Sequence, residues 1–303
     1  MFQLINTTTD VCGGDCQFKR LKGINMSNFI FHNKLGAFLT CIILFCTTIS
    51  SANAGLIINT NFTGGANAGN AVGTGNLVSI FNTAADVWES LIQDDHTLNI
   101  NFSWAALGGG TLGVHNLTGQ GGSPNRETSA NIRFDNDGTS IFYMDDTPLD
   151  NSEWATETLS NADLGGGNIN IGRVFSGATG FAANGYDLYS VALHEIGHAL
   201  GLSSANVAFQ AGNGDLDIDV ISGPFAGSVI PTISGAHLNL STSLMYPFFG
   251  LGARKLISEA DLWANCSISQ FTDCGTTDVP EPSTIAIFAL GIMGLASRRF
   301  KKQ

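Results

Sequence analysis

The run from Val191 to Leu202, which reads VALHEIGHALGL, constrains the fold more than any other part of the 303-residue chain. Its apolar residues predict a helix from about Asp187 to Leu200, stopped by Gly201. His194 and His198 are four residues apart, so their imidazoles lie on one helix face about one turn apart. Both rings can therefore reach a single Zn²⁺ at about 2.0–2.1 Å.

Glu195 completes the chemistry of this helix. It lies next to a predicted ligand, where its carboxylate can take a proton from a water molecule whose pKa zinc lowers towards ~7. The pattern His-Glu-x-x-His is that of the zincins. With 6 histidines in the chain, a chance match is expected only about 0.003 times per chain of this composition.

The residues that follow resemble the metzincins, whose chain turns at a glycine to present a third histidine. Gly201 stands at the turn, but Ser204 occupies the place of the third histidine. The segment from Ser243 to Pro247 (SLMYP) resembles the matrixin Met-turn, with Met245 as the hydrophobic floor of the site. His237 precedes Met245 by eight residues, a spacing similar to that between third ligand and Met-turn in matrixins.

The resemblance implies a zinc site made of His194, His198 and His237, with Glu195 as general base and then acid. Residues 203–234 would then be an insertion between the glycine turn and a displaced third ligand, as in leishmanolysin-type metzincins. The alternatives for the third ligand are Ser204 or a water molecule, and an aspartate of the insertion.

The order of predicted elements agrees with this family. It indicates an α+β fold, a metzincin-like zincin with a twisted mixed sheet, an active-site helix and a small C-terminal subdomain that ends in a helix. The family's cleft is bordered by an edge strand that pairs with an extended substrate. The predicted elements are a strand at 56–62, a helix at 77–92, a strand at 98–104, short strands at 111–115 (the candidate edge strand), 131–134 and 141–144, and a helix from Ser258 with Asp261 as its capping partner.

The first 54 residues end like a secretory signal peptide. Lys34 precedes an apolar run from Leu35 to Ile49, and an Ala-x-Ala exit ends at Ala54. We expect signal peptidase to cleave there, so that the mature chain starts near Gly55. Met26 is an alternative start.

The last 25 residues, 279–303, resemble a PEP-CTERM sorting signal of Gram-negative bacteria. They contain Pro-Glu-Pro (280–282), a short apolar helix at 285–296 and a basic end. The resemblance implies processing by an exosortase; an ordinary C-terminal anchor is the alternative. Contact with the membrane is expected only through this short transmembrane helix. The protein is therefore expected to be exported and periplasmic, cell-surface or extracellular, with a transient inner-membrane anchor.

The body between these ends, residues 55–278, is expected to form the metalloprotease domain. It contains 22 acidic and 5 basic residues, a net charge of −17, which argues against nucleic acid as a partner. Cys266 and Cys274 are most simply a disulfide in an exported protein, with metal binding as the alternative. His96 and His115 are interpreted as surface residues. Acidic runs at 135–138 and 215–219 leave calcium open beside zinc, although neither completes an EF-hand loop.

Two functions remain. The favoured one is a secreted zinc metalloendopeptidase that hydrolyses peptide bonds in a protein or peptide substrate. The alternative, suggested by Ser204 and the sorting tail, is a non-catalytic exported matrix or surface protein on a degenerate metzincin fold. Glu195 argues for the enzyme, because a scaffold has no need of a carboxylate beside two zinc-binding histidines.

Overall fold

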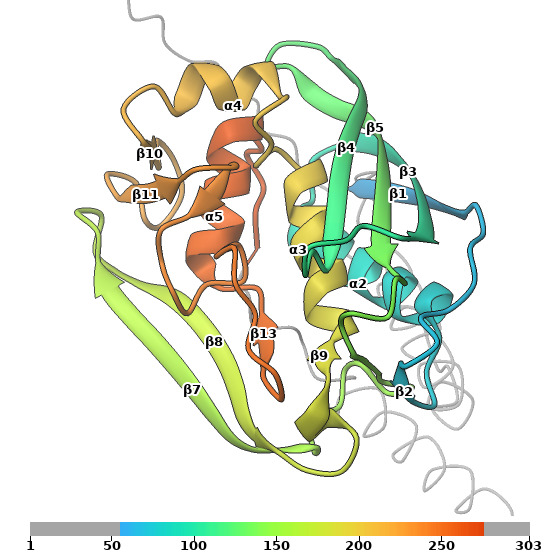
Figure 1. Ribbon diagram of the computed structural model, residues 1–303. Coiled ribbons are helices and arrows are strands. Elements are labelled where there is room, and N and C mark those ends of the chain that lie inside the picture. Colours follow the sequence, from blue (N-terminus) through green and yellow to red (C-terminus); the bar gives the residue numbers. More distant parts are fainter. Residues whose placement is uncertain (1–54, 276–303) are drawn as a thin grey trace, which may run out of the picture. The chain divides into compact units, whose positions relative to one another are not determined.

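The computed structural model describes residues 55–275 (Figure 1). The predicted signal peptide and the predicted C-terminal helix lie outside these residues. Within 55–275, no helix combines the length and the apolar character needed to cross a membrane. In chain order the elements are β1 (Leu56–Phe62), β2 (Val72–Gly73), α2 (Leu77–Leu91), β3 (His96–Ala105), β4 (Gly113–Gly121), β5 (Arg126–Asp135), β6 (Phe142–Met144), β7 (Trp154–Asp163), β8 (Asn168–Ala178), a 3₁₀ turn (Ala182–Asn184), β9 (Tyr186–Asp187), α3 (Leu188–Ala199), α4 (Val207–Gly212), β10 (Asp217–Asp219), β11 (Val229–Ile233), β12 (His237–Leu238), β13 (Arg254–Leu256) and α5 (Glu259–Ser269).

The largest sheet has four strands in the order β1-β3-β5-β4. Strands β1, β3 and β5 are parallel, and β4 joins the outer side of β5 in the antiparallel direction. Alternation divides the faces of the sheet: Leu98, Ile100, Phe102 and Trp104 of β3 point into the core. The opposite face carries a row of amides across all four strands, formed by Asn61, Asn101, Asn131 and Asn116. It is therefore the water-facing side of the sheet.

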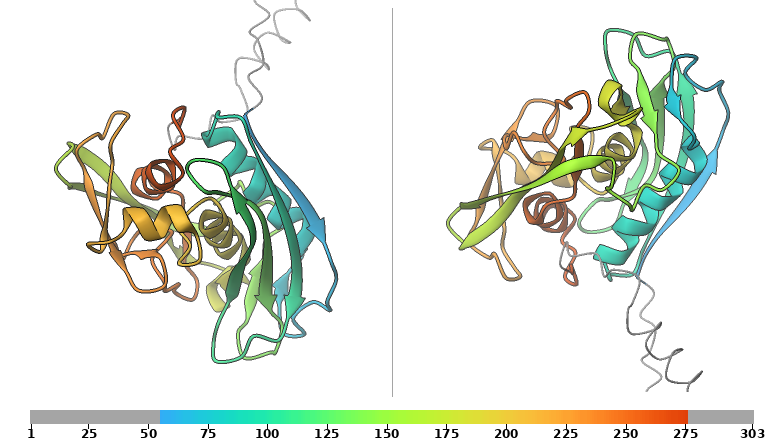
Figure 2. Two further views of the ribbon diagram at one scale, coloured as in Figure 1. Left: turned by 90° about the horizontal axis from the view of Figure 1, so that it is seen from above. Right: turned by 90° about the horizontal axis from the view of Figure 1, so that it is seen from below.

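Helices α2 and α3 cover the apolar face of this sheet, and no other helix of residues 55–275 covers its second face (Figure 2). α2 begins at Asn76, whose side chain accepts from the amide of Ser79, and it buries an apolar stripe. Trp88 of this stripe donates its indole N–H to the carbonyl of Leu193 at 3.0 Å. All twelve residues of α3 are buried, so this helix is the centre of the domain.

The start of α3 is held by a buried ion cluster. Asp187 caps the helix by accepting from the amide and hydroxyl of Ser190. Arg254, which is fully buried, donates two hydrogen bonds of 2.9 Å to Asp187 and one of 2.6 Å to Asp145. Its guanidinium also stacks 4.1 Å above the Trp154 ring. The cluster therefore joins the active-site helix to β13 and to the loop that follows β6.

The C-terminal subdomain combines the β7–β8 hairpin, β13 and α5. β13 pairs with β8, and α5 packs against β8. Ser258 and Asp261 form a capping box at the start of α5, as the sequence predicted.

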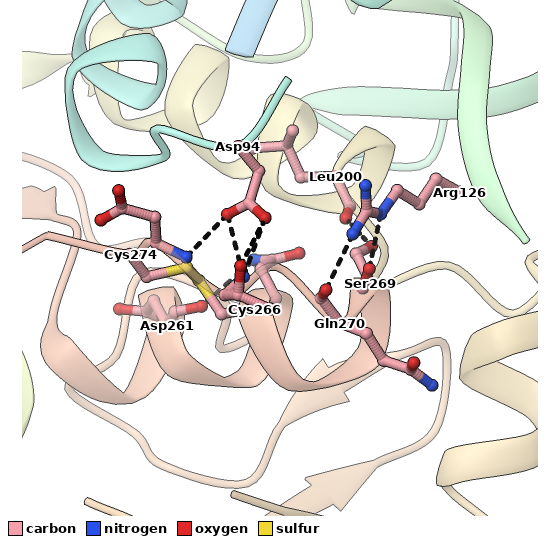
Figure 3. The surroundings of a disulfide bond; sticks show 11 residues. Asp94, Arg126, Leu200, Asp261, Cys266, Ser269, Gln270 and Cys274 are labelled. Carbon is pink, nitrogen blue, oxygen red and sulfur yellow. Dashed lines mark hydrogen bonds between the residues drawn. A yellow bond between two sulfur atoms is a disulfide. The ribbon is translucent and has the colours of Figure 1, made fainter. Parts of the chain in front are cut away.

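A disulfide between Cys266 and Cys274 closes the segment after α5 (Figure 3). The segment is bound to the first half of the chain on both sides. Arg126 donates to the carbonyls of Ser269 and Gln270 at 2.6 and 2.8 Å, and the Asp94 carboxylate accepts from the amides of Thr272 and Asp273. The end of the described chain is thus anchored beside α2.

The predicted α+β class is confirmed, and the predicted elements are present, the strand at 56–62 with the expected bounds and the others with different ones. The expected strand at 111–115 begins at Gly113 and continues to Gly121, and the one at 131–134 is the second half of β5. The β7–β8 hairpin was not predicted. Its strand β7 is mostly exposed on both faces, so its residues lack the apolar alternation by which a strand is detected.

Replacing Arg254 by methionine is expected to lower the free energy of unfolding by about 3–5 kcal/mol, because Asp187 and Asp145 would remain buried without a counter-charge. Denaturant titration of the purified protein measures this change. The matched control is Arg173→Met, which removes a partly exposed pair with Glu157 and should cost less than about 1 kcal/mol. Equal effects of the two substitutions would contradict the importance of the buried cluster.

Candidate active site

Helix α3 presents His194 and His198 to one point. Their Nε2 atoms are 3.1 Å apart. Each Nδ1 contacts a main-chain carbonyl, that of Leu244 for His194 and that of Leu202 for His198. Because a carbonyl oxygen only accepts, both Nδ1 atoms carry the proton, and both Nε2 lone pairs are free to bind a metal.

His237, which follows the predicted insertion in the sequence, lies close to this pair. Its ring centroid lies 5.2 Å from that of His194 and 4.8 Å from that of His198. Its Nδ1 donates to the carbonyl of Ser234 at 3.2 Å. One nitrogen from each of the three rings lies within 4.8 Å of the others. This donor set suits a zinc site with three protein ligands and one open position.

Residues 203–234, the predicted insertion, form a small folded unit that precedes His237. It contains α4 and strands β10 and β11, and β11 pairs with β12, the two-residue strand that begins at His237. Gly235 and Ala236 have φ values of 79° and 62°, which turn the chain just before this strand. The left-handed conformation is unfavourable for alanine, so tertiary packing must stabilise the turn.

Burial keeps the three imidazoles neutral. It lowers the pKa of His194 to about 3, and the neighbouring His237 acts in the same direction. Burial is also the main cause of the lowered pKa of His198 and of His237. Neutral imidazole is the form that binds a metal ion.

Met245 is fully buried, and its sulfur packs against Gly197 of α3, between the two helix histidines in sequence. The Asp261 carboxylate accepts from the amides of Leu244 and Met245 at 3.1 and 2.9 Å and from the hydroxyl of Ser243. The same carboxylate is the capping partner of Ser258 in α5. One side chain therefore fixes both the start of α5 and the Met-turn.

Glu195 points into the cleft from α3. Its side chain approaches β4 so closely that a Cβ placed on Gly113 would lie 2.5 Å from its Oε1 atom. Its Oε2 atom is buried without a hydrogen-bond partner among residues 55–275. Burial raises the pKa of Glu195 to about 8, and the main-chain amide of His115 acts in the opposite direction.

Glu195 and the three histidines line a cavity of about 440 Å³. β4 forms one wall, and it is the edge strand of the large sheet, as expected for the strand beside the cleft. Residues 247–249, His237 and Ser204 also line the cavity. Tyr246 is not part of the lining; it lies 5.1 Å from the ammonium nitrogen of Lys255. Gly201, with φ 148°, turns the chain after α3, and a Cβ there would lie 2.7 Å from the hydroxyl of Ser269.

The interpretation of His115 as a surface residue is wrong. Its side chain is only 5% exposed, borders the cavity and contacts Glu127. The alternation of Gly113, His115 and Leu117 with Val114, Asn116 and Thr118 was a usable signal that His115 faces inward. Glu127 gave no such signal, because irregular pairing near Ser129 changes the face to which it points.

The acidic runs form no comparable site. Within the described residues, the three histidines are the one group of three or more His, Cys, Asp or Glu side chains that could hold a metal. Asp135 accepts from the amides of Leu107 and Asp137, and Asp137 accepts from Thr139, so both stabilise turns. Calcium binding stays a prediction.

Residues 78–209 match the family model of the matrixins, the M10 peptidases. This part of the chain, less than half of its length, is therefore similar to the matrixins. Residues 278–302 match the PEP-CTERM protein-sorting motif. No curated protein and no solved structure matches the chain. The matrixin match includes α3 but ends before His237 and Met245, so the placement of these two residues in the site comes from the structure.

Gly197→Ala tests the contact between α3 and Met245 of the predicted Met-turn. Helix propensity alone favours alanine by about 1 kcal/mol. A Cβ at this position, however, would lie 2.5 Å from the Met245 sulfur. We expect a net loss of about 1–3 kcal/mol in the free energy of unfolding of the metal-free protein.

Gly214→Ala is the control, because nothing lies within 4 Å of a Cβ placed there. Thermal or denaturant unfolding of both variants makes the comparison. A Gly197→Ala variant that is more stable than the original chain would show that Met245 does not pack against α3 in this way.

Proposed function

We propose that the chain is an exported zinc-dependent metalloendopeptidase. The match of residues 78–209 to the matrixins, a zinc-dependent metallopeptidase family, supports this proposal. The observation that carries the proposal is the convergence of three neutral imidazoles beside a buried carboxylate whose Oε2 atom has no partner. Burial of that carboxylate costs free energy, and neither the helix nor the core requires it.

The proposed ligands are His194, His198 and His237. Zinc, when bound, would acidify a water molecule and polarise the carbonyl of the scissile peptide. Glu195 would take a proton from the attacking water as its oxygen bonds to the carbonyl carbon. It would then give that proton to the leaving nitrogen as the C–N bond breaks. The pKa of Glu195, raised by burial, suits a group that both accepts and returns a proton near neutral pH.

The substrate is proposed to bind as an extended peptide along β4. This strand pairs with β5 on one side and lines the cleft with the other, so its free main-chain groups can add a further strand. A peptide that pairs with an edge strand can extend beyond the site in both directions, which is the requirement of an endopeptidase.

The PEP-CTERM match supports export from a Gram-negative cell. We propose that residues 55–278 are the mature body, released from residues 1–54 by signal peptidase and from residues 279–303 by an exosortase. The disulfide between Cys266 and Cys274 agrees with an oxidising compartment outside the inner membrane.

The alternative, a non-catalytic matrix or surface protein, accounts for fewer observations. Its main support was Ser204 in the place of the third histidine. The cluster of His237 with His194 and His198 supports His237 as the third donor, and Ser204 is then not needed as a ligand.

Glu195→Gln is expected to reduce the cleavage rate of casein or of a quenched fluorescent peptide by about 10²–10⁴-fold, because the amide cannot accept the proton. Bound zinc, measured by elemental analysis, should stay at the level of the unmodified chain. Glu157→Gln, a change at a partly exposed glutamate, is the control and should retain full activity. Undiminished cleavage by Glu195→Gln would rule out the proposed mechanism.

His237→Ala is expected to lower zinc affinity by at least tenfold and to abolish cleavage at limiting zinc, since two ligands remain. Competition with a chromogenic chelator gives the affinity. Ser204→Ala discriminates between the candidates and should bind zinc normally. If Ser204→Ala loses zinc while His237→Ala retains it, the serine is the ligand and the assignment of His237 is wrong.

A further inference from the structure

His115 and Glu127 form a buried polar pair beside the three histidines of the proposed metal site. The His115 Nε2 atom lies 2.8 Å from Oε2 of Glu127. The side chain of Glu127 is completely buried and that of His115 is 5% exposed. The pair joins β4, which borders the cleft, to the start of β5.

The position of Glu127 is costly for the fold. A carboxylate removed from water loses hydration that few partners replace. Its Oε1 atom makes no well-aligned hydrogen bond within residues 55–275, and neither does the buried Nδ2 atom of Asn206, although Asn206 and Ser203 lie close enough to favour the charged carboxylate. Burial raises the pKa of Glu127, and the side chains of His115, Asn206 and Ser203 act against this. Apolar residues would fill this space at lower cost, so its retention points to a use for the pair.

The second ring nitrogen of His115 is available to the cleft. Nε2 is bound to Glu127, whereas Nδ1 makes no hydrogen bond to any described residue. Nδ1 is not one of the fully buried polar atoms, so solvent can reach it. Because the ring lines the 440 Å³ cavity, Nδ1 can meet a molecule bound there.

The ring lies close to the reacting centre. Its centroid is 6.1 Å from that of His198, with the two planes inclined by 28°. The main-chain amide of His115 hydrogen-bonds Glu195 and so lowers the pKa of that carboxyl against the effect of burial. Farther along β4, the Gln120 side chain binds the amide of Val207 and the carbonyl of Ala205, which holds this strand against the turn after α3. His115 is therefore fixed in place before a substrate arrives.

We propose that His115, oriented by Glu127, hydrogen-bonds a main-chain N–H group of the peptide substrate through its Nδ1 atom. An ionised Glu127 can only accept, so Nε2 carries the proton and Nδ1 offers a lone pair. A peptide bound along β4 presents such N–H groups at the side of His198. The inference rests on the proposed function and adds a substrate-binding residue to it.

His115→Phe is the central variant, because phenylalanine keeps a ring against His198 but has no nitrogen. We expect kcat/KM for a peptide substrate to fall about tenfold, as for the loss of one hydrogen bond to a group that stays buried. Bound zinc should not change. The matched control is His96→Phe, whose Nε2 contacts the Glu127 carbonyl at 2.7 Å from outside the cavity; its kcat/KM should remain within twofold of the original chain.

A double-mutant cycle tests the coupling to Glu127. Glu127→Gln should lower kcat/KM, and the double variant His115→Phe/Glu127→Gln should be no worse than His115→Phe alone, because Glu127 acts through His115. Additive losses would show that the two residues act separately and would overturn the proposal.

Substrates methylated at one main-chain nitrogen at a time provide a readout that a structural role would not affect. At one position, methylation of the substrate should lower kcat/KM of the original enzyme about as much as His115→Phe does. The same methylation should not lower kcat/KM of the His115→Phe variant any further. The absence of such a position, an effect of His115→Phe below twofold, or a loss explained by lower zinc content would each overturn the proposal.

The peptide affinity of full-length Glu195→Gln, with and without His115→Phe, separates this proposal from the proposed function. Fluorescence anisotropy with a labelled peptide gives the dissociation constants. A tenfold weaker affinity in the double variant supports the role of His115 even if the original chain cleaves nothing. If the affinity is unchanged while the original chain still cleaves peptides, the role of His115 is contradicted and the proposed function stands.

Discussion

The fully buried guanidinium of Arg254 determines how the active-site helix is held. It binds both oxygens of Asp187, the residue that caps α3, and one oxygen of Asp145. A single cation between two buried carboxylates is stable only when its remaining donors are satisfied. The loop at 148–151 supplies these acceptors with two carbonyls and the Asn151 side chain. The helix axis, and with it the direction of the histidine face, follows from this cluster.

A second carboxylate fixes the predicted Met-turn, residues 243–247. Asp261 caps α5 and at the same time binds the amides of Leu244 and Met245. The carbonyl of Leu244 then accepts from Nδ1 of His194. A continuous chain of hydrogen bonds thus runs from the start of α5, through the Met-turn, to a proposed metal ligand. Because a ligand's second nitrogen sets its tautomer, the final helix contributes to the site without contacting it.

His237, the proposed third ligand, reaches the other two histidines through a folded segment. Ser204 occupies the position after the glycine turn, and its hydroxyl is a poor zinc ligand. The residues that follow form α4 and the β10–β11 hairpin, and β11 pairs with β12 at His237. Main-chain pairing therefore returns the chain to the cleft, and the ring of His237 lies within 5.2 Å of the two helix histidines.

The sequence by itself determined the local features. Helical spacing brings His194 and His198 to one face, Gly201 ends their helix, and Ser258 with Asp261 caps the last one. Each of these features depends on neighbours within a few residues, so it can be predicted from the sequence before the fold is known. The capping role of Asp261 could be predicted in this way, but its bonds to the Met-turn could not.

Tertiary structure alone decided the contacts between residues far apart in the chain. Arg254 reaches Asp145 across more than one hundred residues, and irregular strand pairing turns Glu127 inward towards His115. The β7–β8 hairpin also escaped prediction, since its exposed residues carry no apolar period. Such contacts depend on register and on which surfaces meet, and neither is encoded within a short window of sequence. The zinc-helix pattern was therefore readable from the chain, whereas its supporting residues became visible only in the fold.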